Sequence, residues 1–367
     1  MADQPSTGSR LNVVRVIGVL ERGGAQLSAL RLSVALRSHG IVTRLYAGDA
    51  TAEGLALAAA FDVPAEAFAQ QAHLQWVPST DFAEWLRARL ADAELVHAHM
   101  FGAWWAASRA APPGLAVVAS EHNAMAWPRD AHDDEAAAAA PRVACFFAHG
   151  PATRAWAARI GVPGDRIVAG ESVVDGLDGV PQSGLPTPRI TYAGRLVADK
   201  GPDVLIDALG LLADPPPTFL LGDGEQRAAL EHQVAGLGLG DVARFSGWQP
   251  HPEGLIAGAA VHVVPSRRDS WSQSATLAMG LGVPVVATAV EGLPDTLAGG
   301  RGALVAPEDP RALAAAIGAV LAGRCESDLD AARTYARRFR DEWIAPRYAS
   351  VYRAVAGAAR AADRRAA

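Results

Sequence analysis

Lysine is almost absent from this chain, because Lys200 is the only lysine among 33 basic residues and the rest are arginines. Cysteine is also scarce: Cys145 and Cys325 are the two present, and no CxxC pair occurs. This pattern predicts neither a disulfide framework nor a thiolate metal site, and it fits a reducing compartment.

No apolar run approaches the roughly 18 residues that a membrane helix needs. The opening MADQPSTGSR has no apolar stretch of signal-peptide length. We therefore expect a soluble, cytoplasmic protein without integral membrane contact.

Acidic residues outnumber basic ones by 39 to 33, which gives a formal net charge of −6. An acidic balance argues against general nucleic-acid binding, because the phosphate backbone favours clusters of Lys and Arg. Half of the residues are hydrophobic and a fifth are charged, a composition that excludes a disordered chain. A length of 367 residues predicts two domains or more.

Short apolar segments alternate with helical patterns along the whole chain. We expect strands at 12–20, 43–47, 95–99, 116–120, 143–148, 166–169, 190–193, 218–221, 243–245, 261–264, 284–288 and 303–305, and helices at 25–37, 82–90, 103–111, 151–160, 202–212, 225–237 and 310–321, with one or two more over 328–358. The run at 133–140 is expected to form a loop or a short helix with an acidic first turn. This alternation predicts βαβ crossovers and parallel sheets covered by helices.

The segment 181–189, PQSGLPTPR, interrupts the alternation with three prolines and a glycine. It is the best candidate for a linker, so we expect one doubly wound domain over 1–180 and a second over 190–338. Residues 339–367 are expected to form a C-terminal helix. Ligands of such sheets bind beyond the carboxyl ends of the strands.

The segment 192–209 contains the single lysine in a context that favours anion binding. Gly194 and Arg195 follow a strand, and Lys200 precedes a helix that is expected to begin near Pro202. The N–H groups and the dipole of that helix favour an anion. Arginine and lysine bind phosphate differently, one as a fork and one as a point charge. We interpret the pair as a diphosphate site, the alternative being ordinary surface residues near a turn.

A second loop, after the strand at 261–264, has a similar form. Ser272 suits the N-cap of a helix, which leaves the N–H groups of Gln273 and Ser274 for a phosphate. Asp269 precedes this helix and could accept hydrogen bonds from sugar hydroxyls, or it could act only as a capping acid.

Histidines lie at the ends of two of the predicted strands. His97 and His99 lie two residues apart and should point to one face, but no third ligand accompanies them at usable spacing. We therefore expect no metal site. His122 ends the next strand, and either a ligand role or a structural role fits it. Trp104 and Trp105 are expected to pack in a core.

Eight segments follow one another in the order of a known family. They are GGAQ (23–26), VHAH (96–99), SEHN (120–123), AHGPATRAW (148–156), AGRLVADKG (193–201), LLGDGE (220–225), RFSGW (244–248) and LAMGLGVPVVAT (277–288). In this ordered set, nearly the whole chain resembles glycosyltransferase family 4, the retaining nucleotide-sugar transferases of GT-B fold. The resemblance implies an α/β protein with two doubly wound Rossmann-like domains facing a central cleft, the first on the acceptor side and the second binding the nucleotide sugar. It also implies that the C-terminal helix packs back on the first domain.

The resemblance also implies roles for individual residues. Arg195 and Lys200 hold the donor diphosphate, His122 contacts the donor sugar, and Asp269 contacts sugar hydroxyls; these four are the expected catalytic residues. The other expected donor-binding residues are Gly23, Gly24, Gly194, Gly222, Phe245, Gly247, Trp248, Ser272 and Gln273, with Phe245 to Trp248 beside the nucleobase. On the acceptor side the expected residues are Gln26, Glu121, Asn123 and Trp127.

One position departs from the family pattern. The second Glu of the family's E-x7-E motif, which binds the ribose hydroxyls, should fall at 277, where this chain has Leu277. Glu291 is the nearest downstream carboxylate on the same side, but its loop is expected to face the phosphates, so we do not expect it to replace the missing group.

Together, these observations predict a metal-independent hexosyltransferase. It moves a sugar with retention from a nucleoside-diphosphate sugar, expected to be a UDP-sugar, to a hydroxyl of a small-molecule or glycan acceptor, in natural-product or glycan biosynthesis. It needs no cofactor besides this co-substrate. Two alternatives stay open: a nucleotide-sugar 2-epimerase of GT-B fold, and a non-catalytic nucleotide-sugar-binding protein, which Leu277 motivates. A NAD-dependent dehydrogenase is disfavoured because ERGGAQ lacks the G-x-G-x-x-G pattern.

Overall fold

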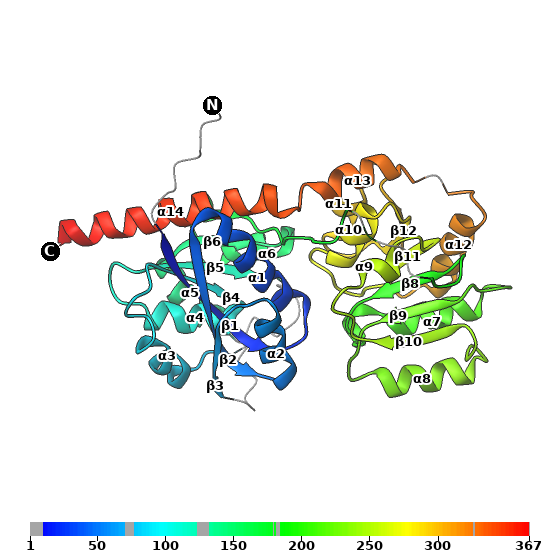
Figure 1. Ribbon diagram of the computed structural model, residues 1–367, viewed down its shortest axis with the longest axis horizontal. Helices are drawn as coiled ribbons and strands as arrows, with labels where there is room; N and C mark the ends of the chain where they lie inside the picture. The colour runs from blue at the N-terminus through cyan, green and yellow to red at the C-terminus, as the bar shows by residue number, and fades with distance from the viewer. Residues whose placement is uncertain are drawn as a thin grey trace. The chain divides into compact units, whose positions relative to one another are not determined.

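The computed structural model describes residues 10–69, 77–122, 132–178, 180, 184–325 and 327–366. The chain divides into two compact units (Figure 1). Unit 1 comprises Met1–Val173 and Asp341–Ala367, and unit 2 comprises Val174–Arg340. The borders expected from the sequence are 180 and 338. The difference has a local cause: Val174 N donates to the carbonyl oxygen of Phe339 at 2.9 Å, and Asp178 forms an ion pair with Arg340 at 2.8 Å, so both borders of unit 2 are tied together.

Within the described residues, unit 1 contains a seven-stranded sheet in the order β3-β2-β1-β4-β5-β6-β7 (Figure 1). Its strands are β1 (Leu11–Leu20), β2 (Ile41–Ala50), β3 (Ala65–Ala69), β4 (Leu95–His99), β5 (Ala116–Glu121), β6 (Val143–Ala148) and β7 (Ile167–Ala169). Its helices are α1 (Gly24–Ala35), α2 (Ala52–Ala60), α3 (Thr80–Arg87), α4 (Phe101–Ala110), α5 (Asp133–Ala139), α6 (Pro151–Arg159) and α14 (Asp341–Ala366), with short 3-10 helices at Leu36–His39, Ala140–Arg142 and Gly164–Arg166.

Unit 2 contains a six-stranded sheet in the order β10-β9-β8-β11-β12-β13. Its strands are β8 (Ile190–Ala193), β9 (Thr218–Leu221), β10 (Ala243–Gly247), β11 (Val261–Val264), β12 (Val285–Thr288) and β13 (Ala303–Val305). Its helices are α7 (Pro202–Gly210), α8 (Arg227–Gly236), α9 (Glu253–Ile256), α10 (Gln273–Gly280), α11 (Leu293–Leu297), α12 (Pro310–Leu321) and α13 (Leu329–Arg337), with a 3-10 turn at Ala198–Lys200. Neighbouring strands pair in parallel in both sheets, which confirms the predicted parallel α/β architecture.

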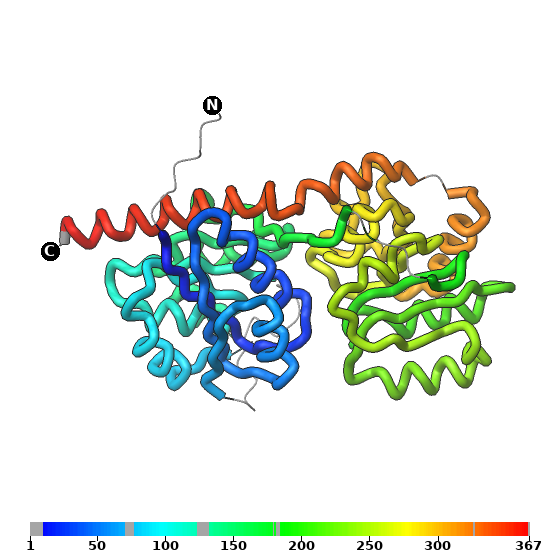
Figure 2. The backbone as a smooth tube through the Cα atoms, viewed as in Figure 1, coloured from blue at the N-terminus to red at the C-terminus, as the bar shows by residue number. Residues whose placement is uncertain are grey.

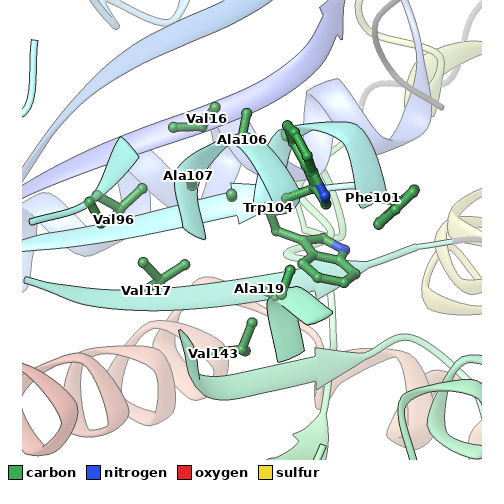
Figure 3. Packing of buried hydrophobic residues seen from close by; sticks show 14 of the residues in the cluster. Val16, Val96, Phe101, Trp104, Ala106, Ala107, Val117, Ala119 and Val143 are labelled. Atoms are coloured by element: carbon green, nitrogen blue, oxygen red, sulfur yellow. The ribbon is translucent and has the colours of Figure 1, made fainter. Parts of the chain in front are cut away.

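The two faces of the unit 1 sheet differ in chemistry. On one face, alternate residues such as Val16 and Val96 pack against α4, which is buried along almost its whole length (Figure 3). Trp104 is completely buried there, with Phe101 and Trp156 rings at 5.1 and 6.0 Å. Trp105 is also buried. The prediction that both tryptophans pack in a core is confirmed, and it removes them as candidates for sugar stacking.

The opposite face of β1, β4 and β5 contains a charged and polar cluster, covered by α1 and by the long last helix α14, which can be followed in Figure 2. Helix α14 contributes an apolar stripe, Ile344, Tyr348, Tyr352 and Ala356, whose members recur every four residues and are buried. Through this stripe α14 belongs to unit 1. Among the helices of the described part of the chain, none is long and apolar enough to cross a membrane.

Candidate functional site

The loops that follow β8, β9 and β11 meet at one edge of the unit 2 sheet with their backbones in close contact. A Cβ added at Gly201, whose φ is 61°, would lie 2.1 Å from the carbonyl oxygen of Pro265. A Cβ added at Gly222, whose φ is 155°, would lie 1.9 Å from the carbonyl oxygen of Gly194. Only glycine permits such approaches. These contacts bring the loops of the predicted donor-binding residues together.

Lys200 and Asp269 form an ion pair at this edge. The ammonium Nζ lies 2.9 Å from Oδ2 of Asp269, and Ser266 Oγ donates to the same carboxylate oxygen at 3.3 Å. The Asp269 side chain is 9% exposed and that of Lys200 is 24% exposed. The acid is therefore buried, whereas the lysine side chain keeps part of its surface exposed. Two residues predicted on separate loops thus come together as one charged group.

Glu291 adds a second carboxylate beside this pair. It follows β12 with a left-handed φ of 42°, and Ser270 Oγ donates to its Oε2 at 3.3 Å. Burial raises the pKa of Glu291 above its ordinary value; the charge of Asp269 adds to the shift, while the Ser270 hydrogen bond and Lys200 oppose it. From the sequence, the loop of Glu291 was expected to face the phosphates, and its side chain was not expected to replace the carboxylate missing at 277. Glu291 follows β12, which lies next to β11 in the parallel sheet. This position predicts that Glu291 and Asp269 lie at the same edge of the sheet.

Two arginines on these loops have different surroundings. Arg195 is exposed, and its main-chain oxygen accepts a hydrogen bond from the Tyr192 hydroxyl at 2.7 Å. Arg267, for which no role was predicted, makes a two-pronged contact with the Asp203 carboxylate at 2.8 and 2.7 Å. Arg267 therefore braces the loop after β11 against the start of α7, whereas the guanidinium of Arg195 remains accessible to a ligand.

Helix α10 begins as the sequence predicts. Ser272 is its N-cap, and the Ser272 hydroxyl accepts from Ala275 N at 3.3 Å, which confirms the predicted cap. Gln273 is the first helical residue. Leu277 lies one turn further on and is 6% exposed, so this departure from the family pattern places an apolar side chain in a buried position.

The predicted nucleobase segment lies at the end of the edge strand β10. Gly222 N donates to the carbonyl oxygen of Gly247 at 2.8 Å, which links this segment to the loop after β9. Phe245 is half-buried against the unit 2 core, and the Arg227 guanidinium lies 5.8 Å from its ring centroid. Trp248 is also half-buried. The segment thus lies beside the loop of Gly222, and its contact with a base stays a prediction.

In unit 1, the glycine loop leads directly into α1. Gly23 is the N-cap of α1, and Gly24 is its first residue. The Gln26 side chain is buried, and its Nε2 donates to the carbonyl oxygen of Val19 at 2.9 Å. A Cβ added at Gly23 would lie 2.4 Å from Gln26 Oε1. Gln26 therefore braces the loop from inside, and this placement does not support the expected acceptor contact.

Glu121, the last residue of β5, is completely buried. Its main-chain oxygen accepts from His149 N at 3.1 Å. A carboxylate with no exposed surface does not support the predicted acceptor contact either. The other two predicted acceptor residues, Asn123 and Trp127, lie outside the described residues.

His97 and His99 point to the same face of the sheet, as predicted, with ring centroids 4.3 Å apart. Between them the structure has a buried cation that the sequence analysis missed. Arg15 of β1 is completely buried, and its Nη1 lies 3.0 Å from His97 Nδ1 and 2.7 Å from His99 Nε2. The sequence feature that could have revealed Arg15 is a single charged residue inside the apolar run NVVRVIGVL. In the described part of the chain, no group of three or more His, Cys, Asp or Glu residues could hold a metal ion.

His122 joins this cluster from the end of β5. Its Nε2 lies 2.9 Å from His99 Nδ1, and its ring is 4.0 Å from that of His149. Burial, reinforced by the charge of Arg15, lowers the pKa of His122 to about 3. Burial also lowers the pKa values of His97, His99 and His149 well below the ordinary value. The four imidazoles are therefore neutral at physiological pH.

The comparisons with known proteins agree with this architecture. The sequence model described as Glycosyltransferase Family 4 matches residues 22–170, and the one described as Glycosyl transferases group 1 matches residues 187–323. The matched regions cover most of both units. The chain belongs to glycosyltransferase family 4 and has the GT-B fold.

Curated relatives match part of the chain. The 2-deoxystreptamine glucosyltransferase of Streptomyces kanamyceticus is 37% identical over 141 residues, which is 36% of each protein. A D-inositol 3-phosphate glycosyltransferase of Geodermatophilus obscurus is 36% identical over 221 residues, which is 56% of this chain and 47% of the relative. The matches thus span about a third to a half of these relatives' length.

Two solved structures share the fold over nearly the whole chain. Anabaena Alr3699/HepE in complex with UDP-glucose superposes with a TM-score of 0.79 at 19% identity and covers 93% of this chain and 99% of its own. The sucrose-phosphate synthase of Thermosynechococcus elongatus superposes with a TM-score of 0.76 at 21% identity and covers 95% and 100%.

Buried neutral histidines predict that acid destabilises the protein. His262 of β11 is a suitable test case. It lies outside the charged clusters described above, and burial lowers its pKa to about 3. Between an unfolded pKa of about 6.5 and this folded value, only the unfolded state binds the proton. The free energy of unfolding therefore falls as the pH falls through this window, by about 1.4 kcal/mol per pH unit for each such histidine. Urea unfolding at several pH values from 7.5 to 5.5 should show this slope.

The matched variants are His262→Gln and His232→Gln, both in unit 2. The first removes a buried titrating group and should reduce the slope. The second replaces an exposed histidine of α8 and should leave the slope unchanged. Equal slopes in the wild type and His262→Gln would show that His262 is not held neutral by the fold.

Proposed function

We propose that this protein transfers a hexosyl group from a UDP-sugar to a hydroxyl of a small-molecule or glycan acceptor, with retention of anomeric configuration and without a metal ion. Family membership supports the reaction class. HepE was solved with UDP-glucose, which supports the donor class. The relatives' names contain 2-deoxystreptamine and D-inositol 3-phosphate, which makes cyclitols the first acceptors to test. The observation that carries the proposal is the ion pair of Lys200 with Asp269, in which the carboxylate is buried and the lysine side chain is partly exposed.

The charge that develops in this reaction lies on the departing diphosphate. The Lys200 side chain is partly exposed, and the exposed Arg195 lies in the same segment between β8 and α7. Preorganised donors aimed at developing charge are commonly the largest contribution to catalysis. In this proposal the two cations and the N-terminus of α10 stabilise the leaving group, in place of a divalent cation.

The two carboxylates near Lys200 have different proposed roles. Asp269 orients the ammonium through the 2.9 Å contact and accepts hydrogen bonds from sugar hydroxyls. Glu291 lies beside this pair, and burial raises its pKa, which disfavours a second negative charge next to the diphosphate. His122 of unit 1 contacts the transferred sugar as a neutral group. No carboxylate of the site is required as a covalent nucleophile in this proposal.

Replacing Lys200 tests the assignment. Lys200→Ala should reduce transfer from a UDP-sugar to a cyclitol at least about 100-fold, because one charge contact to the leaving group is lost. Lys200→Arg should also be impaired, since a planar fork does not fill the place of a compact ammonium. The measurement is product formation by mass spectrometry, with folding checked by far-UV circular dichroism.

The control is Arg311→Ala on α12, which removes an exposed cation of unit 2 and should leave the rate unchanged. Wild-type turnover in Lys200→Ala would contradict the assignment. A reaction without acceptor that yields the epimeric nucleotide sugar would instead identify an epimerase, and tight donor binding without any reaction would identify a binding protein.

Position 277 provides a second test. We expect Leu277→Glu to lower KM for a UDP-sugar and to leave kcat within a few-fold, because a carboxylate that accepts from ribose adds uniform binding. Charged hydrogen bonds of this kind contribute about 1.5–3 kcal/mol. The effect should be smaller for the 2′-deoxyribose donor. Leu277→Gln is the uncharged control of similar size. A destabilised Leu277→Glu protein with weaker donor binding would show that position 277 faces apolar packing instead of the ribose.

A further inference from the structure

The Arg15 guanidinium is enclosed on every side that the structure describes. Its Nε donates to Ser33 Oγ of α1 at 2.9 Å, its Nη2 donates to the Tyr352 hydroxyl of α14 at 3.4 Å, and its Nη1 faces His97 and His99. None of these partners is an anion. Burying a charge without an opposite charge is costly unless it is fully hydrogen-bonded, so the structure retains Arg15 at a stability cost.

The direction of each hydrogen bond in this cluster follows from chemistry. A guanidinium has only donors, so His99 Nε2, at 2.7 Å from Arg15 Nη1, must be an acceptor. A neutral imidazole with an unprotonated Nε2 has its proton on Nδ1. His99 Nδ1 therefore donates to His122 Nε2 at 2.9 Å. His122 is then also unprotonated at Nε2 and has its proton on Nδ1. These proton positions are inferred from the hydrogen-bond pattern.

The hydrogen bonds of His97 have directions that are consistent with those of His99. His97 Nδ1 accepts from Arg15 at 3.0 Å and is also in contact with the Tyr352 hydroxyl. His97 Nε2 therefore has the proton and donates to Ser120 Oγ at 2.8 Å. The two hydrogens of Arg15 Nη1 are thus used by the two imidazoles, one by each. Helices α1 and α14 hold the guanidinium in the orientation that makes both bonds.

We propose that Arg15 is a positioning residue that, acting through His99, holds His122 in the tautomer with its proton on Nδ1 and so presents a neutral N–H donor to the transferred sugar. Among the described residues, His122 Nδ1 has no hydrogen-bond partner. The one nitrogen of His122 left for a ligand is therefore a donor. The sugar contact rests on the proposed function, whereas the tautomer does not.

The charge state supports the same conclusion. The pKa of His122 is lowered to about 3 by burial and by the Arg15 charge, so the imidazole stays neutral in the working range. Its single lone pair is used by His99. His122 therefore has no free basic nitrogen, and a sugar oxygen is the type of atom that it can bind.

The experiment is nitrogen NMR of the full chain labelled with ¹⁵N-histidine. Long-range proton–nitrogen correlations distinguish a protonated Nδ1 from a protonated Nε2 without any substrate, and His122→Gln assigns the signal. In the wild type we expect His122 in the Nδ1–H form. An Nε2–H form in the wild type overturns the proposal, whatever the enzyme's activity.

Two substitutions at position 99 separate positioning from packing. His99→Leu removes the bond to His122 and should release its tautomer. His99→Gln keeps an acceptor for Arg15 and a donor for His122, and it should retain the Nδ1–H form. Arg15→Met should release the tautomer as His99→Leu does. Ser28→Ala, which removes a buried hydrogen bond to Ser172 outside the cluster, is the control and should change nothing.

Activity is the second readout. Loss of the His122 tautomer in His99→Leu should lower kcat/KM about 10- to 100-fold, the scale found for groups that orient functional histidines in metal sites; His99→Gln should recover most of it. A tautomer that persists in both His99→Leu and Arg15→Met overturns the proposal. A released tautomer with unchanged turnover overturns its functional part. If the wild type performs no transfer, the proposed function fails, and the tautomer measurement still decides the role of Arg15.

Discussion

Unit 1 is organised around a charge that cannot be neutralised in place. Arginine stays protonated in proteins, and Arg15 is completely buried at the centre of the sheet. Its hydrogen-bond partners come from β4, α1 and α14, which bind it through two imidazoles and two hydroxyls. This side chain therefore joins polar groups of three elements on one face of the sheet. Burial lowers the pKa values of the neighbouring His97 and His99, and the charge of Arg15 lowers them further.

In unit 2, the cation Lys200 differs from Arg15 in both its partner and its exposure. Lys200 is paired with one buried carboxylate and is left partly exposed, so its charge remains available to a ligand. An arginine-rich composition with one lysine is consistent with a position where a compact ammonium is needed. We propose that the buried cation orients other side chains and that the partly exposed one binds an anion; their exposure and their partners differ accordingly.

Most strands of both sheets could be predicted from the sequence. Strands β4, β6, β8, β9 and β11 have the predicted bounds, because buried parallel strands are short, continuous apolar runs bounded by turns. The partly exposed edge strand β13 also has its predicted bounds. The helix α2 and the edge strand β3 were missed, because AEGLALAAA and AEAFA are alanine-rich and show neither periodicity clearly. In the candidate site, the motif order predicted roles for Lys200 and Asp269, which the structure brings together as an ion pair; their contact with a donor stays a prediction. Motifs do not reveal which polar groups are enclosed: Gln26 and Glu121 are buried, and Arg15 contacts histidines of β4, a strand far from it in the sequence.

The claim that cations of unit 2 bind the donor diphosphate without a metal is tested most directly by calorimetric titration of UDP, UMP and uridine in the presence of EDTA. Each charged hydrogen bond to a phosphate contributes about 1.5–3 kcal/mol. UDP should therefore bind at least about tenfold tighter than UMP, and uridine should bind weakest. Equal affinities for the three ligands, or UDP binding that appears only when Mg²⁺ is supplied, would contradict the account.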